Sequence, residues 1–313
     1  MEKTCFVGVD VGGTKVAAGL VNAEGEIAAQ IRVPMISNGT PESGLNAVLL
    51  AIAQIAPAGD VGISGIGICA PGPLDPETGI ILNPPNVPCW RGFPLADAVR
   101  DIHRVPVKVD NDANAAALAE SRWGAGRGYR NLFYATIGTG IGTGIILDGK
   151  VYHGRTGSAG EGGHVSIDYR GPICRCGKPG GIEILASGTA IARRAQEVIE
   201  AGRKSSMIEL AGVGAISGEI VGKASENGDP LAREILFETT EMLALWLSNM
   251  VDLFDPEIIV IGGGAAAMLR LFFDQLRKRM PKFAVNPRAS EVPIVQARYG
   301  ADAGIAGGAA PCA

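Results

Sequence analysis

Two glycine-rich stretches of the sequence combine residue types that could hold a polyphosphate. Residues 10–15 read DVGGTK, and residues 138–144 read GTGIGTG. Glycine lets backbone N–H groups converge on a phosphate, Thr and Lys add donors, and Asp10 can hold a divalent cation through water. The alternative for the first stretch is a plain hairpin turn, because Gly-Gly between strands is a common turn signal.

The second stretch favours the phosphate interpretation. Alternating glycine would weaken an ordinary strand, because glycine has no side chain to pack and costs backbone entropy. We therefore expect both turns to face one polyphosphate. The residues concerned are Asp10, Gly12, Gly13, Thr14, Lys15, Gly138, Thr139, Gly140 and Gly142.

A third glycine group, Gly262-Gly263-Gly264, follows the apolar run EIIVI and is expected to lie against a base or ribose. With Ala267 it also fits the dinucleotide fingerprint G-x-G-x-x-A. An NAD enzyme is disfavoured, because no acidic residue ends a second strand about 20 residues further on. The sequence contains no Walker A motif either.

Asp112 is a candidate general base. The stretch VDNDANAAALAE places Asn111 and Asp112 where a strand ends and a helix begins. The plainer interpretation is a helix N-cap, for which Asp and Asn are favoured. Phosphoryl transfer needs one carboxylate to take the hydroxyl proton, and such a base contributes about 10² to 10⁴ in rate. A residue at a strand tip can do this while its neighbours start the helix.

The stretch CRCGKPGG, residues 174–181, contains part of a metal site. Cys174 follows His164 by ten residues, and Cys176 adds a second thiolate. A structural zinc site almost always has four protein ligands. Either the metal has been lost or the loop holds something else in place.

Two similar halves of the chain are predicted to carry these residues. Residues 5–27 alternate as a strand, turn at Gly12-Gly13, resume as a second strand and turn again. Residues 131–152 repeat this pattern roughly 130 residues later. Because strand and helix patterns alternate around the repeats, we predict an α/β protein with a cleft between two domains, where ligands usually bind.

Composition excludes several classes of function. The chain has 313 residues, 47% of them hydrophobic, so its core needs no metal or disulfide for stability. A net charge of −4 without a basic run argues against nucleic acid or an anionic membrane as partner. The six cysteines are mostly scattered and no signal-peptide core is present, which favours a reducing cytoplasm.

Taken together, the motifs resemble those of the ROK family of sugar kinases, and most closely those of its bacterial glucokinases. The resemblance runs from residue 8 to residue 308 in the family's order. The matching stretches are DVGGTK, APGPLDPETG, NPPNVPCWRGFPL, VDNDANAAALAE, TIGTGIGTGIILDGK, GSAGEGGHV, CRCGKPGGIE and VIGGG.

The resemblance implies the two-domain, ribonuclease H-like fold of hexokinases and actin-like ATPases, with duplicated β-hairpin and βα units and an interdomain cleft. Residues 1–112 and about 299–313 are expected to form a small N-terminal domain with the first phosphate turn. Residues 113–298 are expected to form a large C-terminal domain with the second turn and the sugar and nucleotide sites. The family also implies a homodimer, and symmetric dimers are the usual oligomer.

The implied activity is transfer of the γ-phosphate of ATP to the 6-hydroxyl of a hexose, with Mg²⁺ as the cation. Asp112 matches the family's catalytic aspartate, and Asn111 matches its sugar-binding neighbour. Carboxylates, amides and imidazoles suit sugar hydroxyls, with which they exchange hydrogen bonds. The substrate-binding residues implied are Asn86, Asn111, Asp112, Glu161, His164 and Glu183.

Several alternatives stay open. The stretches NVPCWRGFPL and EGGH favour glucose as the substrate. The alternative substrates are N-acetylglucosamine, N-acetylmannosamine, mannose, allose and fructose. Polyphosphate could also replace ATP as the phosphoryl donor. A non-catalytic sugar sensor is another class, although Asp112 and two intact glycine turns would have no chemical purpose in it. ROK repressors carry a winged helix before the first glycine turn. Because that turn begins here at Gly12, we expect no DNA-binding domain.

The sequence departs from the family in the cysteine-containing loop. Members with a metal carry C-x-C-G-x-x-G-C-x-E, in which three cysteines and the histidine of the G-H pair bind zinc. Here His164, Cys174 and Cys176 match. The third cysteine position is Gly181, which supplies no side-chain ligand. We therefore expect no stoichiometric zinc, and a loop from residue 171 to 184 that keeps its shape by its own turns and hydrogen bonds.

Overall fold

The chain divides into two compact units. The computed structural model describes residues 5–56, 62–268 and 272–313. The first unit comprises residues 1–130, 144–160 and 298–313. The second unit comprises residues 131–143 and 161–297. The first unit therefore combines both ends of the sequence with a segment from its middle.

The first unit is built on a mixed five-stranded sheet with the order β3-β2-β1-β4-β8. Strands β1, β2 and β3 are consecutive and antiparallel, and β4 and β8 continue the sheet in parallel with β1. Their bounds are β1 (Cys5–Val11), β2 (Lys15–Asn22), β3 (Ile27–Pro34), β4 (Ile63–Ala70) and β8 (Val107–Asn111). The predicted strand, glycine turn and strand of the first repeat are therefore present.

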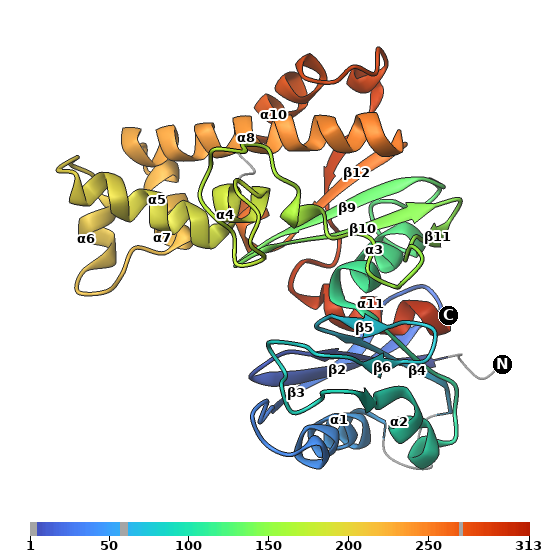
Figure 1. The fold of residues 1–313 in the computed structure, drawn as a ribbon. Helices are drawn as coiled ribbons and strands as arrows, with labels where there is room; N and C mark the ends of the chain where they lie inside the picture. Colours follow the sequence, from blue (N-terminus) through green and yellow to red (C-terminus); the bar gives the residue numbers. More distant parts are fainter. Residues whose placement is uncertain (1–4, 57–61, 269–271) are drawn as a thin grey trace. The chain divides into compact units, whose positions relative to one another are not determined.

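Helices cover both faces of this sheet. Because successive side chains of a strand point to opposite faces, β1 contributes to a core on each side. Val7 and Val9 belong to the core under α1 (Pro41–Ile55) and α2 (Leu95–His103). Phe6 belongs to the opposite core, with α3 (Asp112–Arg122) and α11 (Ala303–Ala309). Figure 1 shows these two layers on either side of the sheet. The helix that carries Asp112 therefore packs within the first unit.

The compact units are cut differently from the predicted domains. Residues 113–130 and 144–160, which we assigned to the second domain, belong to the first unit. One reason is that α3 lies against α11, where a Cβ added at Gly307 would come within 2.7 Å of the Ala115 carbonyl carbon. The predicted boundaries at residues 112 and 298 stay a prediction about domains.

The second sheet repeats the hairpin pattern with the order β11-β10-β9-β12-β13. Strand β12 runs parallel to both β9 and β13. The bounds are β9 (Leu132–Ile137), β10 (Ile141–Leu147), β11 (Lys150–Val151), β12 (Ile258–Gly262) and β13 (Ile294–Gln296). The boundary between the units falls within β10.

The longest helix of the second unit, α8, begins after Asp229, whose carboxylate accepts the N–H of Ala232 at 2.9 Å. Trp246 of α8 packs edge-on against Phe133 of β9, with 5.7 Å between ring centroids. In the part of this unit that the structure describes, the α-helices are α4 (Ile182–Ala186), α5 (Gly188–Glu200), α6 (Met207–Ala211), α7 (Gly218–Glu226), α8 (Pro230–Phe254), α9 (Gly264–Met268) and α10 (Phe273–Arg279).

Short elements complete the units. A small sheet has the order β5-β6-β7, with bounds β5 (Leu74–Asp75), β6 (Ile80–Ile81) and β7 (Phe93–Pro94). Among the described residues, the 3₁₀ helices with stated bounds are η1 (Gly162–His164), η3 (Met280–Lys282), η4 (Ala289–Glu291), η5 (Gly300–Asp302) and η6 (Ala310–Cys312). Across residues 5–56, 62–268 and 272–313, no helix has both the length and the apolar character needed to cross a bilayer.

Candidate active site

The first glycine turn joins β1 to β2 in the first unit. The Gly12 N–H donates to Lys15 O at 2.9 Å, and the side chains of Thr14 and Lys15 are exposed. Asp10 lies beside Cys69, whose Sγ is 3.5 Å from Oδ1. Burial raises the pKa of Asp10, although the Cys69 hydrogen bond and the charge of Lys15 oppose this effect. The turn thus presents donors and the carboxylate that the phosphate interpretation requires.

The end of β8 places Asn111 and Asp112 at the start of α3. Asn111 Oδ1 accepts the Ala113 N–H at 3.0 Å, so Asn111 is the N-cap of the helix. Asp112 Oδ1 accepts the same N–H at 2.8 Å, and Asp112 is exposed. The structural and chemical interpretations are therefore compatible, since Asp112 contributes to the helix start and remains accessible.

Asp110 and His153 form a contact that the sequence interpretation missed. The buried Asp110 carboxylate accepts the Asn111 N–H at 2.7 Å through Oδ1, and its Oδ2 is 2.8 Å from His153 Nε2. The only sequence signal was the acidic residue two positions before Asp112. Asp110 Oδ1 also accepts a hydrogen bond from Asn114 Nδ2 at 3.4 Å. Asp110 therefore stabilises the segment that carries Asp112.

The second glycine turn joins β9 to β10 in the second unit. The Gly138 N–H donates to Gly140 O at 2.9 Å, which closes the turn. The start of α5 holds it in place, since the Gly188 N–H donates to Gly138 O at 2.8 Å and Thr189 Oγ1 donates to Thr139 O at 2.8 Å.

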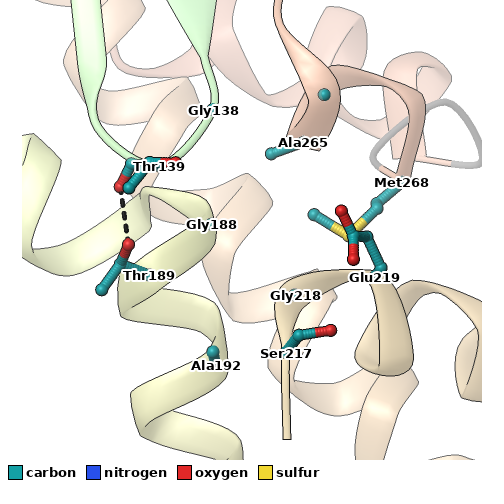
Figure 2. Close-up of a pocket in the computed structure, with 11 residues that line it drawn as sticks. Gly138, Thr139, Gly188, Thr189, Ala192, Ser217, Gly218, Glu219, Ala265 and Met268 are labelled. Atoms are coloured by element: carbon teal, nitrogen blue, oxygen red, sulfur yellow. Dashed lines mark hydrogen bonds between the residues drawn. The ribbon is translucent and has the colours of Figure 1, made fainter. Parts of the chain in front are cut away.

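This turn borders a pocket of about 440 Å³ that lies entirely within the second unit. Figure 2 shows the turn and the starts of α5, α7 and α9 around the pocket, with Glu219 as the charged side chain among its lining residues. The lining residues are Gly138, Thr139, Gly188, Thr189, Ala192, Ser217, Gly218, Glu219, Gly264, Ala265 and Met268. The sequence pointed to Gly138, Thr139 and Gly264, but residues of α5 and α7 carried no motif.

The third glycine group has two different surroundings. Gly264 lines the pocket, whereas Gly262 packs against Tyr134, where an added Cβ would lie 2.6 Å from the hydroxyl oxygen. Gly263 has a φ of 90° and lies against the backbone of Ile137. Gly262 and Gly263 therefore serve close packing against β9, and Gly264 is the member of the group that lines the pocket.

Three of the residues expected to bind sugar lie in the second unit. His164 Nε2 is 3.8 Å from Glu161 Oε2, and both belong to the segment at η1. Glu183, in the first turn of α4, accepts the Ile141 N–H at 2.9 Å. Asn86 lies in the first unit and is exposed, and its carbonyl oxygen would be 2.9 Å from a Cβ added at Gly13.

The cysteine-containing loop brings its three matching ligands together. The ligand atoms of His164, Cys174 and Cys176 all lie within 4.8 Å of one another. At Gly181 an added Cβ would find its nearest neighbour at 3.6 Å, so a larger residue would fit there, but glycine offers no ligand atom. This set does not complete a site of four protein ligands.

Backbone hydrogen bonds hold the same loop. Cys174 N–H donates to Lys178 O at 2.8 Å, Ile167 N–H donates to Gly180 O at 2.9 Å, and Gly180 N–H donates to Pro172 O at 2.8 Å. The Ile182 N–H donates to Val165 O at 3.0 Å, which ties the loop back beside His164. The loop thus has internal support independent of a metal.

A family model described as the ROK family matches residues 6–312. The chain belongs to the ROK family. Its fold is that of the actin-like ATPases, as the motifs predicted.

Similar proteins include sugar kinases of nearly the same length. A glucokinase of Thermotoga maritima is 34% identical, over 99% of this chain and 97% of the relative. An N-acetylmannosamine kinase of Escherichia fergusonii is 32% identical, over 96% of each chain. A ROK family glucokinase of Streptomyces griseus, solved in complex with glucose and AMPPNP, superimposes with a TM-score of 0.82. That structure is 35% identical and covers 97% of this chain and 98% of its own.

Proposed function

We propose that this ROK-family sugar kinase is a glucokinase that transfers the γ-phosphate of ATP to the 6-hydroxyl of glucose. The observation that carries the proposal is the pocket of about 440 Å³ bordered by the second glycine turn and three helix starts. Backbone N–H groups at turns and helix starts suit phosphate, and the cavity lies in the size range of small-molecule sites. The glucokinase relatives agree with this assignment.

The nucleotide is proposed to use both glycine turns. In the second unit, the phosphates are held by Gly138, Thr139, Gly140 and Gly142. Gly264 lines the pocket, and Gly262 and Gly263 are proposed to support it from their packing against β9. Gly12, Gly13, Thr14 and Lys15 hold them from the first unit. Asp10 suits Mg²⁺ because it offers a carboxylate beside this turn. The cation supplies neutralisation of the charge on the transferring phosphoryl group.

Asp112 is proposed as the general base. The 6-hydroxyl oxygen forms a bond to the γ-phosphorus while the bond from that phosphorus to the bridging oxygen breaks. The hydroxyl proton passes to the Asp112 carboxylate, and ADP leaves with the bridging oxygen. The other sugar hydroxyls are held by Asn86, Asn111, Glu161, His164 and Glu183. This binding positions the reacting oxygen.

The test is a coupled ADP-release assay across glucose, mannose, fructose, allose, N-acetylglucosamine and N-acetylmannosamine. Preferred release with glucose is the expected result. Release with N-acetylmannosamine alone would favour the activity of the second type of relative. No release with any sugar, but binding in calorimetry, would favour a sensor. Replacing ATP with polyphosphate in the same assay tests the phosphoryl donor.

The proposed setting is cytoplasmic glycolysis, in which glucose phosphorylation is the entry step, and the proposed assembly is a homodimer. Symmetric dimers are the commonest oligomers of soluble proteins. Light scattering coupled to size exclusion gives the mass in solution, and twice the chain mass of 32.2 kDa is expected.

A further inference from the structure

The first residues of β10 contact segments that carry proposed sugar ligands. The Ile141 N–H donates to Glu183 Oε2 at 2.9 Å. Two positions further on, Thr143 Oγ1 accepts the Gly162 N–H at 2.9 Å, next to Glu161. A Cβ added at Gly163 would overlap the Ile141 carbonyl oxygen, so this part of η1 also lies directly on the strand. All these residues belong to the second unit.

The same strand begins at the phosphate turn. Gly140 immediately precedes Ile141, and its carbonyl accepts the Gly138 N–H that closes the turn. A Cβ added at Gly140 would overlap Glu183 Oε2. The carboxylate of Glu183 therefore lies against the turn and holds the first N–H beyond it.

The first unit shows the same kind of contact with different residues. Gly13 belongs to the first phosphate turn, and a Cβ added there would be 2.9 Å from the carbonyl oxygen of Asn86. In each unit, a turn glycine lies against a residue proposed to bind sugar. This contact is made by backbone in the first unit and by a side chain in the second.

We propose that Glu183 is a positioning residue that couples sugar binding to the geometry of the second phosphate turn. The inference rests on the proposed function. A sugar that engages this carboxylate restricts its orientation and thereby orders the Ile141 N–H and the turn before it. Hydrogen bonds to a charged acceptor are the stronger kind. The Ile141–Glu183 hydrogen bond can therefore transmit the orientation of the carboxylate to the turn. Because coupling of two binding equilibria is reciprocal, nucleotide bound at the turn also strengthens sugar binding.

A matched pair of alanine variants tests the coupling. Gly140→Ala places a methyl group against the end of the flexible Glu183 side chain, which can move without a shift of the backbone. Gly138→Ala adds the same methyl group to the same turn, where, apart from its two chain neighbours, no atom of the described residues lies within 4 Å. Glucose and AMPPNP affinities are measured separately by calorimetry on the full chain.

Gly140→Ala is expected to raise the Kd for glucose about 10-fold or more, since a hydrogen bond to a charged group is at stake. Gly138→Ala is expected to weaken AMPPNP binding, because the residue lines the pocket, and to leave the glucose Kd within about 2-fold of wild type. Equal glucose affinities in the two variants would overturn the coupling.

Glu183→Gln provides a second measurement that does not depend on the turn variants. In the wild type, saturating AMPPNP is expected to lower the glucose Kd about 5-fold or more. The ratio of the glucose Kd without AMPPNP to the Kd with AMPPNP should approach one in Glu183→Gln. A wild-type ratio of one, or the same ratio in both proteins, would reject the coupling. Absence of glucose-dependent ADP release by the wild type would instead reject the proposed function and the coupling with it.

Discussion

Two aspartates of the VDND stretch differ in their surroundings. Asp112 is exposed at the start of α3, whereas Asp110 is buried and contacts His153, Asn111 and Asn114. A buried carboxylate needs partners to offset the cost of burying its charge, and Asp110 has them. An accessible carboxylate on a well-held strand end is suited to receive a proton, which is why Asp112 rather than Asp110 is the proposed base.

Asp112→Ala is expected to lower kcat about 10² to 10⁴-fold, because the proposed base is lost. Nucleotide binding should persist, because the pocket belongs to the second unit. Steady-state kinetics and AMPPNP calorimetry check both statements. Asp101→Ala, which removes an exposed carboxylate on α2, is the control. Near-normal turnover of Asp112→Ala would disprove the assignment.

We expect His153 to make the free energy of unfolding depend on pH. The hydrogen bond to Asp110 raises the pKa of His153 against the effect of burial, and the charges of Asp110 and Glu77 add to the rise. The His153–Asp110 pair contributes its full stabilisation of the folded state below the unfolded histidine pKa of about 6.5. This contribution is lost as the pH rises through the raised pKa of His153. As the pH rises from the unfolded pKa through the raised pKa, the unfolding free energy of wild type should fall relative to His153→Gln.

Urea unfolding at several pH values measures this difference. His103 provides a control of opposite sign, because burial lowers its pKa and its protonation opposes folding. Wild type should therefore gain stability relative to His103→Gln as the pH rises. Parallel pH profiles for wild type and His153→Gln would show that the contact with Asp110 contributes no charge effect.

The purified protein is expected to contain less than one zinc per chain, and a chelator should leave its activity intact. The reason is that His164, Cys174 and Cys176 supply three ligands, while backbone hydrogen bonds support the loop. Gly181→Cys is the matched variant, since the position has room for a Cβ. It should gain zinc in elemental analysis. Stoichiometric zinc in the wild type would contradict this prediction.

At the scale of elements, helix starts both shape the pocket and stabilise the second unit. The starts of α5, α7 and α9 surround the pocket, and Ser187 and Ser217 cap α5 and α7. Capping side chains occupy backbone donors near a helix start, which determines which of them remain for a ligand. The long helix α8 has a different cap, because Asp229 also accepts the Ser206 N–H at 2.8 Å.

Asp229→Ala is expected to lower the unfolding free energy by about 1–2 kcal/mol. Burial alone would raise the pKa of Asp229, but hydrogen bonds from Ala232, Ser206 and Ser205 lower it to about 2. The stabilisation is complete above the unfolded value of 3.8 and is lost as the pH falls toward about 2. Urea unfolding at neutral pH measures the loss. Asp229→Asn should also lose stability, because both carboxylate oxygens accept hydrogen bonds and an amide has a single acceptor oxygen. Equal stability of Asp229→Ala and wild type would refute the cap.

At the scale of the whole molecule, the proposed reaction draws on both units. The first unit holds Asp10, the first turn, Asn86, Asn111 and Asp112, and the second holds the pocket, Glu161, His164 and Glu183. Each unit therefore contains residues proposed for phosphate and residues proposed for sugar. The contact between a turn glycine and a sugar residue within each unit gives this division a common pattern.

The sequence by itself determined the features that depend on neighbouring residues. The hairpins follow from alternation interrupted by glycine, and the cap at Asn111 follows from its place before an alanine-rich helix. The family and the fold class followed from motifs spread along the chain and are confirmed.

Only the tertiary structure decided which distant segments meet. The Asp110–His153 contact joins residues 43 positions apart, the Ile141–Glu183 hydrogen bond joins residues 42 apart, and Thr189 meets Thr139 across 50. No local pattern marks such pairs, because they depend on how β8 lies against the segment after β11 and on how β10, α4 and α5 pack. The physical reason is that a hairpin or a cap is formed by nearby atoms, whereas a pocket is formed by burial of elements against one another.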